Sequence, residues 1–189
     1  DHVETYVVQE AIWDLWECRG SLSKQVGKSY SADGVHLCTV ETCDCCIYDG
    51  GFGGERPPKD VVEYSDREPD LTYEEVCGYQ WPLIYRLMGD WHQQHIDWAY
   101  TEQTGLARPI NHGVCAAGIA MRHLIALLIP GQPERLRRFK CRFTSPVLPG
   151  TRLCTQVWKV GEGEARFCMV NADEPEAKPY LSACLAEWE

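Results

Sequence analysis

The sequence predicts an α+β protein, with helical segments first and an antiparallel sheet after them. Two observations predict this order. A run rich in glycine, alanine and cysteine opens a long apolar segment, and we expect a helix over residues 112–128. Beyond Pro130, four segments have strand length and are separated by glycine or proline: 138–143, 151–160, 164–172 and 180–188. At 189 residues the chain is long enough for one well-formed core.

The amino-terminal part, residues 1–49, is expected to form a helix and a hairpin. Apolar side chains within residues 3–16 recur close to helical spacing. Two β-like runs follow, at 28–32 and 35–48, and Gly34 separates them. We therefore expect a small unit with one helix and two paired strands.

An extended connecting segment is expected over residues 50–70. The stretch Gly50-Gly51-Phe52-Gly53-Gly54 interrupts the preceding pattern, and three prolines follow it within the segment. Proline removes a backbone donor and excludes a continuous helix or a central strand. Residues 71–189 are then the second and larger domain.

Two helices are expected before the long one. Thr72 with Glu75 three residues later is a capping-box pattern, which predicts a helix running on to about Met88. Asp97 is placed to cap a short helix that ends at Gly105. The loop between these helices is where we expect functional side chains to project.

Charge and hydropathy indicate the kind of partner. The formal net charge is −10, which argues against nucleic acid, and no apolar run is long enough for a membrane helix. Small molecules are the expected ligands. One basic run interrupts this acidic chain, and it is either the solvated face of a strand or a site for a phosphate-bearing tail: Arg135, Arg137, Arg138, Lys140 and Arg142.

The eleven cysteines are scattered through apolar patterns, which favours free thiols and a reducing compartment. The cluster Cys43-Asp44-Cys45-Cys46 is interpreted as ordinary strand packing, with metal binding as the alternative. The amino terminus lacks a secretory pattern, and Ala186-Glu187-Trp188-Glu189 is unlike a peroxisomal Ser-Lys-Leu signal. We therefore expect an intracellular protein, in the cytoplasm rather than the peroxisome.

Asp90 and His95 carry the chemical signal of this sequence. A carboxylate and an imidazole five positions apart in one loop are able to share a water molecule and act as a general base. His112 and Gly113 then open the long helix, where the backbone N–H of Gly113 is placed to donate to a carbonyl oxygen that gains negative charge. This pattern predicts acid/base chemistry on a carbonyl compound.

These residues belong to a wider resemblance. The segments 90–97 and 108–113, together with Gly50-Gly51-Phe52-Gly53-Gly54-Glu55-Arg56, Tyr85-Arg86-Leu87-Met88-Gly89-Asp90 and Pro146-Val147-Leu148-Pro149-Gly150, resemble MaoC-like hydratases and dehydratases. The resemblance is to the type 2, R-specific enoyl-CoA hydratases in particular, and it covers about three quarters of the chain. It implies the hotdog fold, a curved antiparallel sheet wrapped around the helix at about 112–128, with residues 1–49 as a reduced first repeat.

The resemblance also implies roles. Asp90 and His95 would be the catalytic pair and Gly113 the oxyanion donor. The reaction would add water to a trans-2-enoyl thioester, or remove it from an R-3-hydroxyacyl thioester, without a metal or other cofactor. The substrate would be carried on coenzyme A or a carrier protein. Further residues are predicted to contact it: Arg56, Trp91, His92, Arg108, His112 and Arg138.

Two departures from the family pattern leave alternatives open. His92-Gln93 stand where Asn-Pro is usual, and Gln94 replaces a usual apolar residue. These substitutions are the first departure. The second is the short amino-terminal part, which predicts a homodimer with its pocket near the subunit interface. The alternatives are a dehydratase, isomerase or cyclase acting on a polyketide-like intermediate, a non-catalytic acyl-binding subunit, and a metal-dependent enzyme that uses His92, His95, Asp97 and His112.

Overall fold

The computed structural model describes residues 3–15 and 20–189, and the chain divides into two compact units, Asp1–Lys59 and Asp60–Glu189. The division falls inside the segment 50–70 that the sequence predicts to be a connection. Each unit has its own antiparallel sheet.

The first unit is a three-stranded antiparallel sheet in the order β1-β2-β3. Its strands are β1 (Val3–Asp14), β2 (Ser21–Ser31) and β3 (His36–Cys46). The predicted hairpin is confirmed, although β2 begins earlier than expected. The predicted helix over 3–16 is wrong for the residues described, since 3–14 form a strand; Trp16 lies outside them. This segment contains three valines together with isoleucine, tyrosine and tryptophan, which favour strands, and it pairs with β2 along its length.

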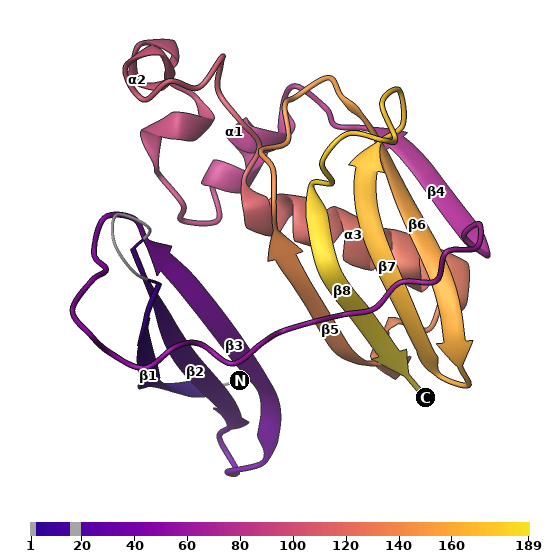
Figure 1. Ribbon diagram of the computed structural model, residues 1–189. Coiled ribbons are helices and arrows are strands. Elements are labelled where there is room, and N and C mark those ends of the chain that lie inside the picture. Colours follow the sequence, from indigo (N-terminus) through magenta and orange to yellow (C-terminus); the bar gives the residue numbers. More distant parts are fainter. Residues whose placement is uncertain (1–2, 16–19) are drawn as a thin grey trace. The chain divides into compact units, whose positions relative to one another are not determined.

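The second unit contains a five-stranded antiparallel sheet in the order β4-β6-β7-β8-β5 (Figure 1). All four strands predicted beyond Pro130 are confirmed. The five strands have these bounds: β4 (Leu71–Val76), β5 (Leu136–Phe143), β6 (Arg152–Gly161), β7 (Glu164–Asn171) and β8 (Leu181–Trp188).

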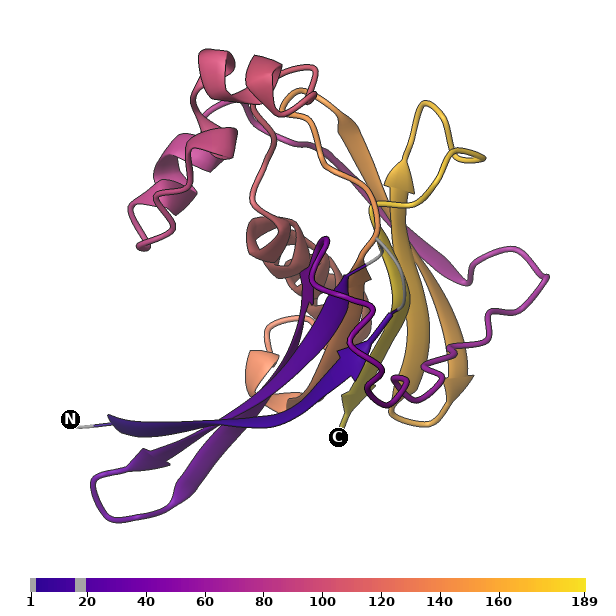
Figure 2. The ribbon, with the colours of Figure 1, turned by 60° about the vertical axis from the view of Figure 1, so that its left-hand side comes forward.

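The long helix α3 (Gly113–Leu128) lies against one face of this sheet, which curves around it (Figure 2). This confirms the predicted central helix. The other helical segments are α1 (Trp81–Arg86), the 3₁₀ turns η1 (Gln93–His95) and η2 (Pro133–Arg135), and α2 (Trp98–Gln103). Within the described residues, no helix combines the length and apolar character needed to cross a membrane.

Small side chains explain how α3 approaches the sheet. Ala116 and Ala120 are 1% and 0% exposed and belong to the same core as Phe167 and Met169 of β7, which are both fully buried. Alanine allows helix and strand backbones to come close, so the larger sheet residues fill the remaining space. The core of the second unit therefore fixes the start of α3, where the candidate site lies.

The helix predicted over residues 72–88 is wrong in its first half. Residues 71–76 form β4, which pairs with β6, and the helix α1 begins only at Trp81. The capping-box pattern does not operate, because Glu75 is bonded to His123 of α3 and Tyr73 stacks on the same ring at 4.2 Å. Long-range pairing has outweighed a local signal.

The cysteines of the second unit are free thiols, and Cys18 lies outside the described residues. Cys43 and Cys45 are exposed on β3. Burial raises the pKa of several thiols in the second unit, including Cys77, to about 12, and Cys141, to about 11. These buried thiols are therefore protonated at neutral pH.

Candidate active site

The loop between α1 and α2 is folded by its own sequence. Gly89 has φ of +113°, a conformation that glycine adopts readily, and it turns the chain out of α1 toward Asp90. His92 caps η1, because its Nδ1 accepts the N–H of Gln94 at 3.3 Å. Asp97 caps α2 by accepting from Ala99 and Tyr100, as the sequence predicts. His95 is thus held between two capped turns.

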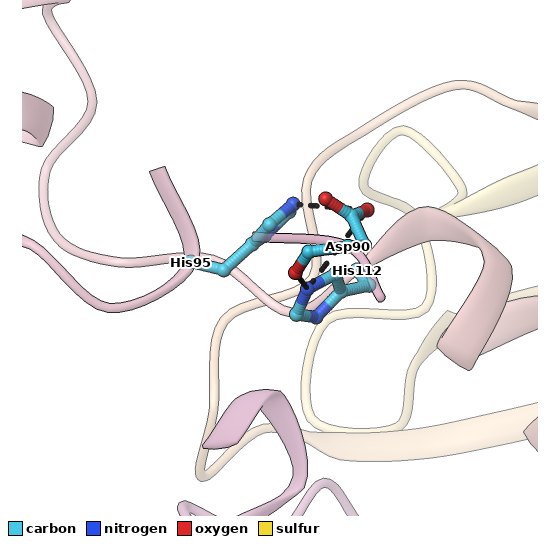
Figure 3. Close-up of side chains that lie close together, drawn as sticks. All are labelled: Asp90, His95 and His112. Carbon is cyan, nitrogen blue, oxygen red and sulfur yellow. Dashed lines mark hydrogen bonds and ion pairs between the residues drawn. The ribbon is translucent and has the colours of Figure 1, made fainter. Parts of the chain in front are cut away.

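Asp90, His95 and His112 converge at this point (Figure 3). The Asp90 Oδ2 atom lies 3.9 Å from Nε2 of His95 and 3.9 Å from Nε2 of His112. The carboxylate is 48% exposed, whereas the two imidazole side chains are 4% and 1% exposed. A separation of 3.9 Å is too long for a direct hydrogen bond, but a water molecule is able to bridge Asp90 and His95.

The hydrogen bonds of His95 define its protonation. Its Nδ1 lies 2.9 Å from the carbonyl oxygen of Ile110, which only accepts, so Nδ1 carries the hydrogen. Burial is the main cause that lowers the pKa of His95 below 6.5. The neutral ring therefore presents an unprotonated Nε2, which accepts from the side-chain amide of Gln94 at 3.2 Å.

His112 contacts both Asp90 and His95. Its ring stacks on that of His95 with centroids 3.6 Å apart, and Tyr85 packs against it at 4.6 Å. Its Nε2 donates to the backbone carbonyl of Asp90 at 3.3 Å. His112 therefore holds both members of the pair, one through its backbone and the other through ring packing.

The amino terminus of α3 lies next to the pair. His112 is the N-cap residue and Gly113 is the first helical residue, so the first N–H groups have no partner within the helix. A side chain at Gly113 would come within 3.2 Å of the Phe143 ring. Glycine therefore avoids a close contact between the helix start and this ring, and the helix dipole makes the position favourable for negative charge.

A cavity of about 300 Å³ opens at the start of α3. Its wall combines the loop between α1 and α2, the helix start and the segment after β5, and it includes Gln94, His95, Gly113, Phe143, Thr144 and Tyr180. A ligand in this cavity would have His95 and the helix start beside it. That is the arrangement needed to polarise a carbonyl group while protons move on adjacent carbons.

Other predicted residues of the loop have structural partners. The exposed Trp91 ring lies under the Arg86 guanidinium at 4.9 Å, and its carbonyl accepts from the same side chain at 2.6 Å. His92 and Asp97 are engaged as caps. These contacts position the loop.

The residues predicted to contact phosphate differ in their surroundings. Arg138 on β5 pairs with Glu187 at 2.9 Å. Other cations of the basic run also pair with carboxylates, as in the contacts of Lys140 and Arg142 with Asp60. Arg108 is half-buried in the loop that leads to α3. Arg56 belongs to the first unit, whose placement relative to this site is not defined.

A metal would find one suitable group among the described residues. Asp90, His95 and His112 offer ligand atoms within 4.8 Å of one another. The sequence-based alternative named His92, His95, Asp97 and His112. Two of these, His95 and His112, belong to the group, whereas His92 and Asp97 are engaged as caps. The hydrogen that His112 Nε2 donates to the Asp90 carbonyl would have to be lost on metal binding.

Asn111 was not among the predicted site residues. It is 2% exposed, its amide has no hydrogen-bond partner among the residues that the structure describes, and it lines the cavity. A polar residue between Ile110 and His112, just before a helix of small residues, was the available signal. Its burial depends on the segment around Val147, whose carbonyl accepts the Asn111 N–H, and the local sequence does not show this contact.

Comparison with known proteins identifies the family of this chain. Residues 66–175 match the family described as the MaoC like domain. The 3-hydroxyacyl-thioester dehydratase Y of Mycobacterium tuberculosis is 37% identical over 143 residues, which cover 74% of this chain and 49% of that protein. A probable enoyl-CoA hydratase 2 of Dictyostelium discoideum is 39% identical over 114 residues, covering 59% of this chain and 39% of the relative.

The fold is shared with solved structures. A MaoC-like dehydratase from Phytophthora capsici superposes with a TM-score of 0.86 at 24% identity, covering 99% of this chain and 64% of that one. The architecture is therefore the hotdog fold. The chain belongs to the MaoC-like dehydratase family. It spans about half or less of the length of these curated relatives.

Proposed function

We propose that this chain is a hydro-lyase that adds water to an enoyl thioester or removes it from an R-3-hydroxyacyl thioester. The observation that carries the proposal is the 3.9 Å gap between the Asp90 carboxylate and His95 Nε2, beside the start of α3. At this separation, one water molecule lying to the side of the two atoms is able to contact both.

The hydration step follows from this placement. The water oxygen forms a bond to C3 of the enoyl group while one of its O–H bonds breaks. The proton passes to the Asp90/His95 pair and is then delivered to C2, so that the net change is addition of H and OH. The reverse sequence removes water from the hydroxyacyl thioester.

Polarisation of the thioester makes both carbons reactive. The Gly113 N–H donates to the carbonyl oxygen as electron density moves onto it, and the dipole of α3 stabilises that charge. His95 remains neutral and able to accept a proton because burial lowers its pKa. His112 keeps the pair in register through the stacked ring and the Asp90 carbonyl.

Turnover of coenzyme A thioesters tests the proposal. Purified protein is mixed with trans-2-enoyl-CoA substrates of graded chain length, and loss of the conjugated chromophore is followed together with the configuration of the product. We expect hydration to the R-3-hydroxyacyl product. Absence of turnover in both directions, with folded protein and every chain length, would contradict the proposed function.

The carrier and the assembly form part of the same proposal. Arg108, which is half-buried in the loop that leads to the helix start, is the proposed contact for a carrier phosphate. Arg108→Ala is then expected to raise KM with little change in kcat. A homodimer is supported by apolar side chains exposed on the first sheet, among them Val7, Val8 and Val40. Light scattering after gel filtration measures its mass.

A further inference from the structure

Gln94 places an amide in the cavity wall beside the reacting groups, and its backbone is fixed on both sides. Its N–H donates to His92 Nδ1 at 3.3 Å, and its carbonyl accepts the N–H of Ile110 at 3.1 Å. The main chain of this residue therefore cannot shift without breaking the turn that holds His95. Only the side-chain torsions of Gln94 are free to adapt to a ligand.

The partner of the amide determines which end remains available. Because Nε2 of His95 is unprotonated, the Gln94 nitrogen faces it as donor, at 3.2 Å. The Gln94 Oε1 atom then has no hydrogen-bond partner among the described residues. Unlike the amide atoms of Asn111, it is not enclosed by protein. The cavity wall thus carries an accessible acceptor that no protein group satisfies.

The neighbouring hydroxyl of the cavity is already satisfied. Thr144 Oγ1 lies 2.6 Å from Ser182 Oγ and also contacts the Arg142 carbonyl at 3.2 Å. It has less capacity to bind a polar ligand group than Gln94 Oε1 does. Gln94 Oε1 is therefore an accessible, unmatched acceptor of this wall that a ligand donor would satisfy.

We propose that Gln94 determines substrate specificity by accepting a hydrogen bond from a hydroxyl group on the acyl chain. The preferred substrate is a thioester whose acyl group carries a hydroxyl in addition to the carbons that react. This inference rests on the proposed function and narrows its substrate class. A plain alkyl chain would desolvate Oε1 without replacing the water that bonds it, which costs free energy.

The cavity size limits the rest of the acyl group. A volume of about 300 Å³ is at the low end for ligand sites. A short chain with one additional hydroxyl suits both the space and the acceptor. A hydroxyl two carbons beyond C3 matches the alternating oxygenation of a polyketide-like chain.

Binding of unreactive thioesters tests the inference separately from catalysis. Hexanoyl-CoA and 5-hydroxyhexanoyl-CoA are titrated calorimetrically into the wild-type protein and into Gln94→Met, which keeps the length of the side chain and removes the amide. The wild type is expected to bind the hydroxylated compound roughly three- to tenfold more tightly, the effect of one net hydrogen bond. Gln94→Met is expected to bind both equally.

Gln93→Met is the matched control, since Gln93 is an exposed neighbour in the same turn. It should keep the wild-type preference. Gln94→Leu is a second variant if Gln94→Met does not fold. Three results would overturn the inference: equal affinities of the wild type for the two compounds, no binding of either compound, or an unchanged preference for the hydroxylated compound in the Gln94 variants.

Two unsaturated substrates, trans-2-hexenoyl-CoA and its 5-hydroxy derivative, separate this inference from the proposed function. If the wild type prefers 5-hydroxyhexanoyl-CoA but hydrates neither trans-2-hexenoyl-CoA nor its 5-hydroxy derivative, the proposed reaction fails and the binding preference stands. If both are hydrated with equal kcat/KM and bound equally, the reaction stands and the role of Gln94 is lost.

Discussion

The second unit contains two carboxylate–imidazole pairs with opposite designs. In the loop, Asp90 and His95 are separated by 3.9 Å, and Asp90 is 48% exposed. Between β4 and α3, Glu75 bonds directly to His123 at 2.8 Å. The second ring is fully buried, and its other nitrogen lies 2.8 Å from Thr155 Oγ1.

The difference shows which pair is open to chemistry. His123 is fully buried and contacts the Glu75 carboxylate directly at 2.8 Å, which leaves no gap for a ligand between them, so this pair ties α3 to the sheet. The loop pair leaves a gap at the cavity and accepts a bridging water. Similar side chains thus stabilise the fold in one place and are available for proton transfer in the other.

The largest expected effect is on catalysis at the loop pair. His95→Ala should lower kcat of hydration by about a hundredfold or more, because it removes a proton acceptor. His92→Asn is the control, since asparagine also caps a helical turn, and it should stay within about threefold of wild type. Steady-state kinetics measures both, and a small loss in His95→Ala would remove this residue from the mechanism.

Changes to the buried pair, Glu75 and His123, should lower the stability of the fold. His123→Leu is expected to lower the free energy of unfolding by about 2–4 kcal/mol, because it leaves the Glu75 carboxylate and the Thr155 hydroxyl without this partner. Urea denaturation measures the change. Full activity per folded molecule is expected at low temperature, and a hundredfold loss of kcat there would mean that the pairs do not differ in role.

A smaller effect is expected where the helix start meets the cavity. Gly113→Ala would place a methyl group 3.2 Å from the Phe143 ring and should slow hydration by about tenfold, or about 1.4 kcal/mol. Gly118→Ala on the same helix is the control, because nothing lies within 4 Å of the added carbon. It should leave kinetics unchanged. Equal rates in the two variants would argue against close ligand approach at Gly113.

The smallest effect is the dependence of stability on pH. Burial lowers the pKa values of both His95 and His123 below 6.5. In that range the unfolded chain binds more protons than the folded protein, so stability is present above pH 6.5 and declines as pH falls toward the lowered values. Denaturation at several pH values should show this slope, and His123→Leu should show a shallower one. An unchanged slope in the variant would exclude His123 as a source.

The sequence predicted those parts of the fold that depend on local pattern. The four strands beyond Pro130 and the helix of small residues follow from alternation and composition. Residues 3–14 and 71–76 were misassigned because strand pairing determines their structure. The partners of Glu75 are Arg122 and His123, 47 and 48 residues away on α3, and the Thr72/Glu75 spacing does not indicate these contacts.

The candidate site was also predicted only where local spacing indicates it. The spacing of Asp90, His95 and Gly113 indicated the chemistry, and the structure brings all three to one end of α3. The support from His112 depends on ring stacking across a 17-residue separation, which spacing alone does not show. Arg138 was predicted to meet phosphate, yet Glu187 on the adjacent strand pairs with it. Such pairs depend on sheet register, which the sequence does not show.

Parallel kinetics and denaturation of Asp90→Asn and Glu75→Gln test the central claim most directly. Both changes replace a carboxylate by its amide, one in each pair. We predict that Asp90→Asn slows hydration of trans-2-enoyl-CoA by about a hundredfold or more with unfolding unchanged, and that Glu75→Gln loses stability while keeping kcat within a few-fold. Equal rates for Asp90→Asn and wild type, or matching catalytic losses in both variants, would contradict the account.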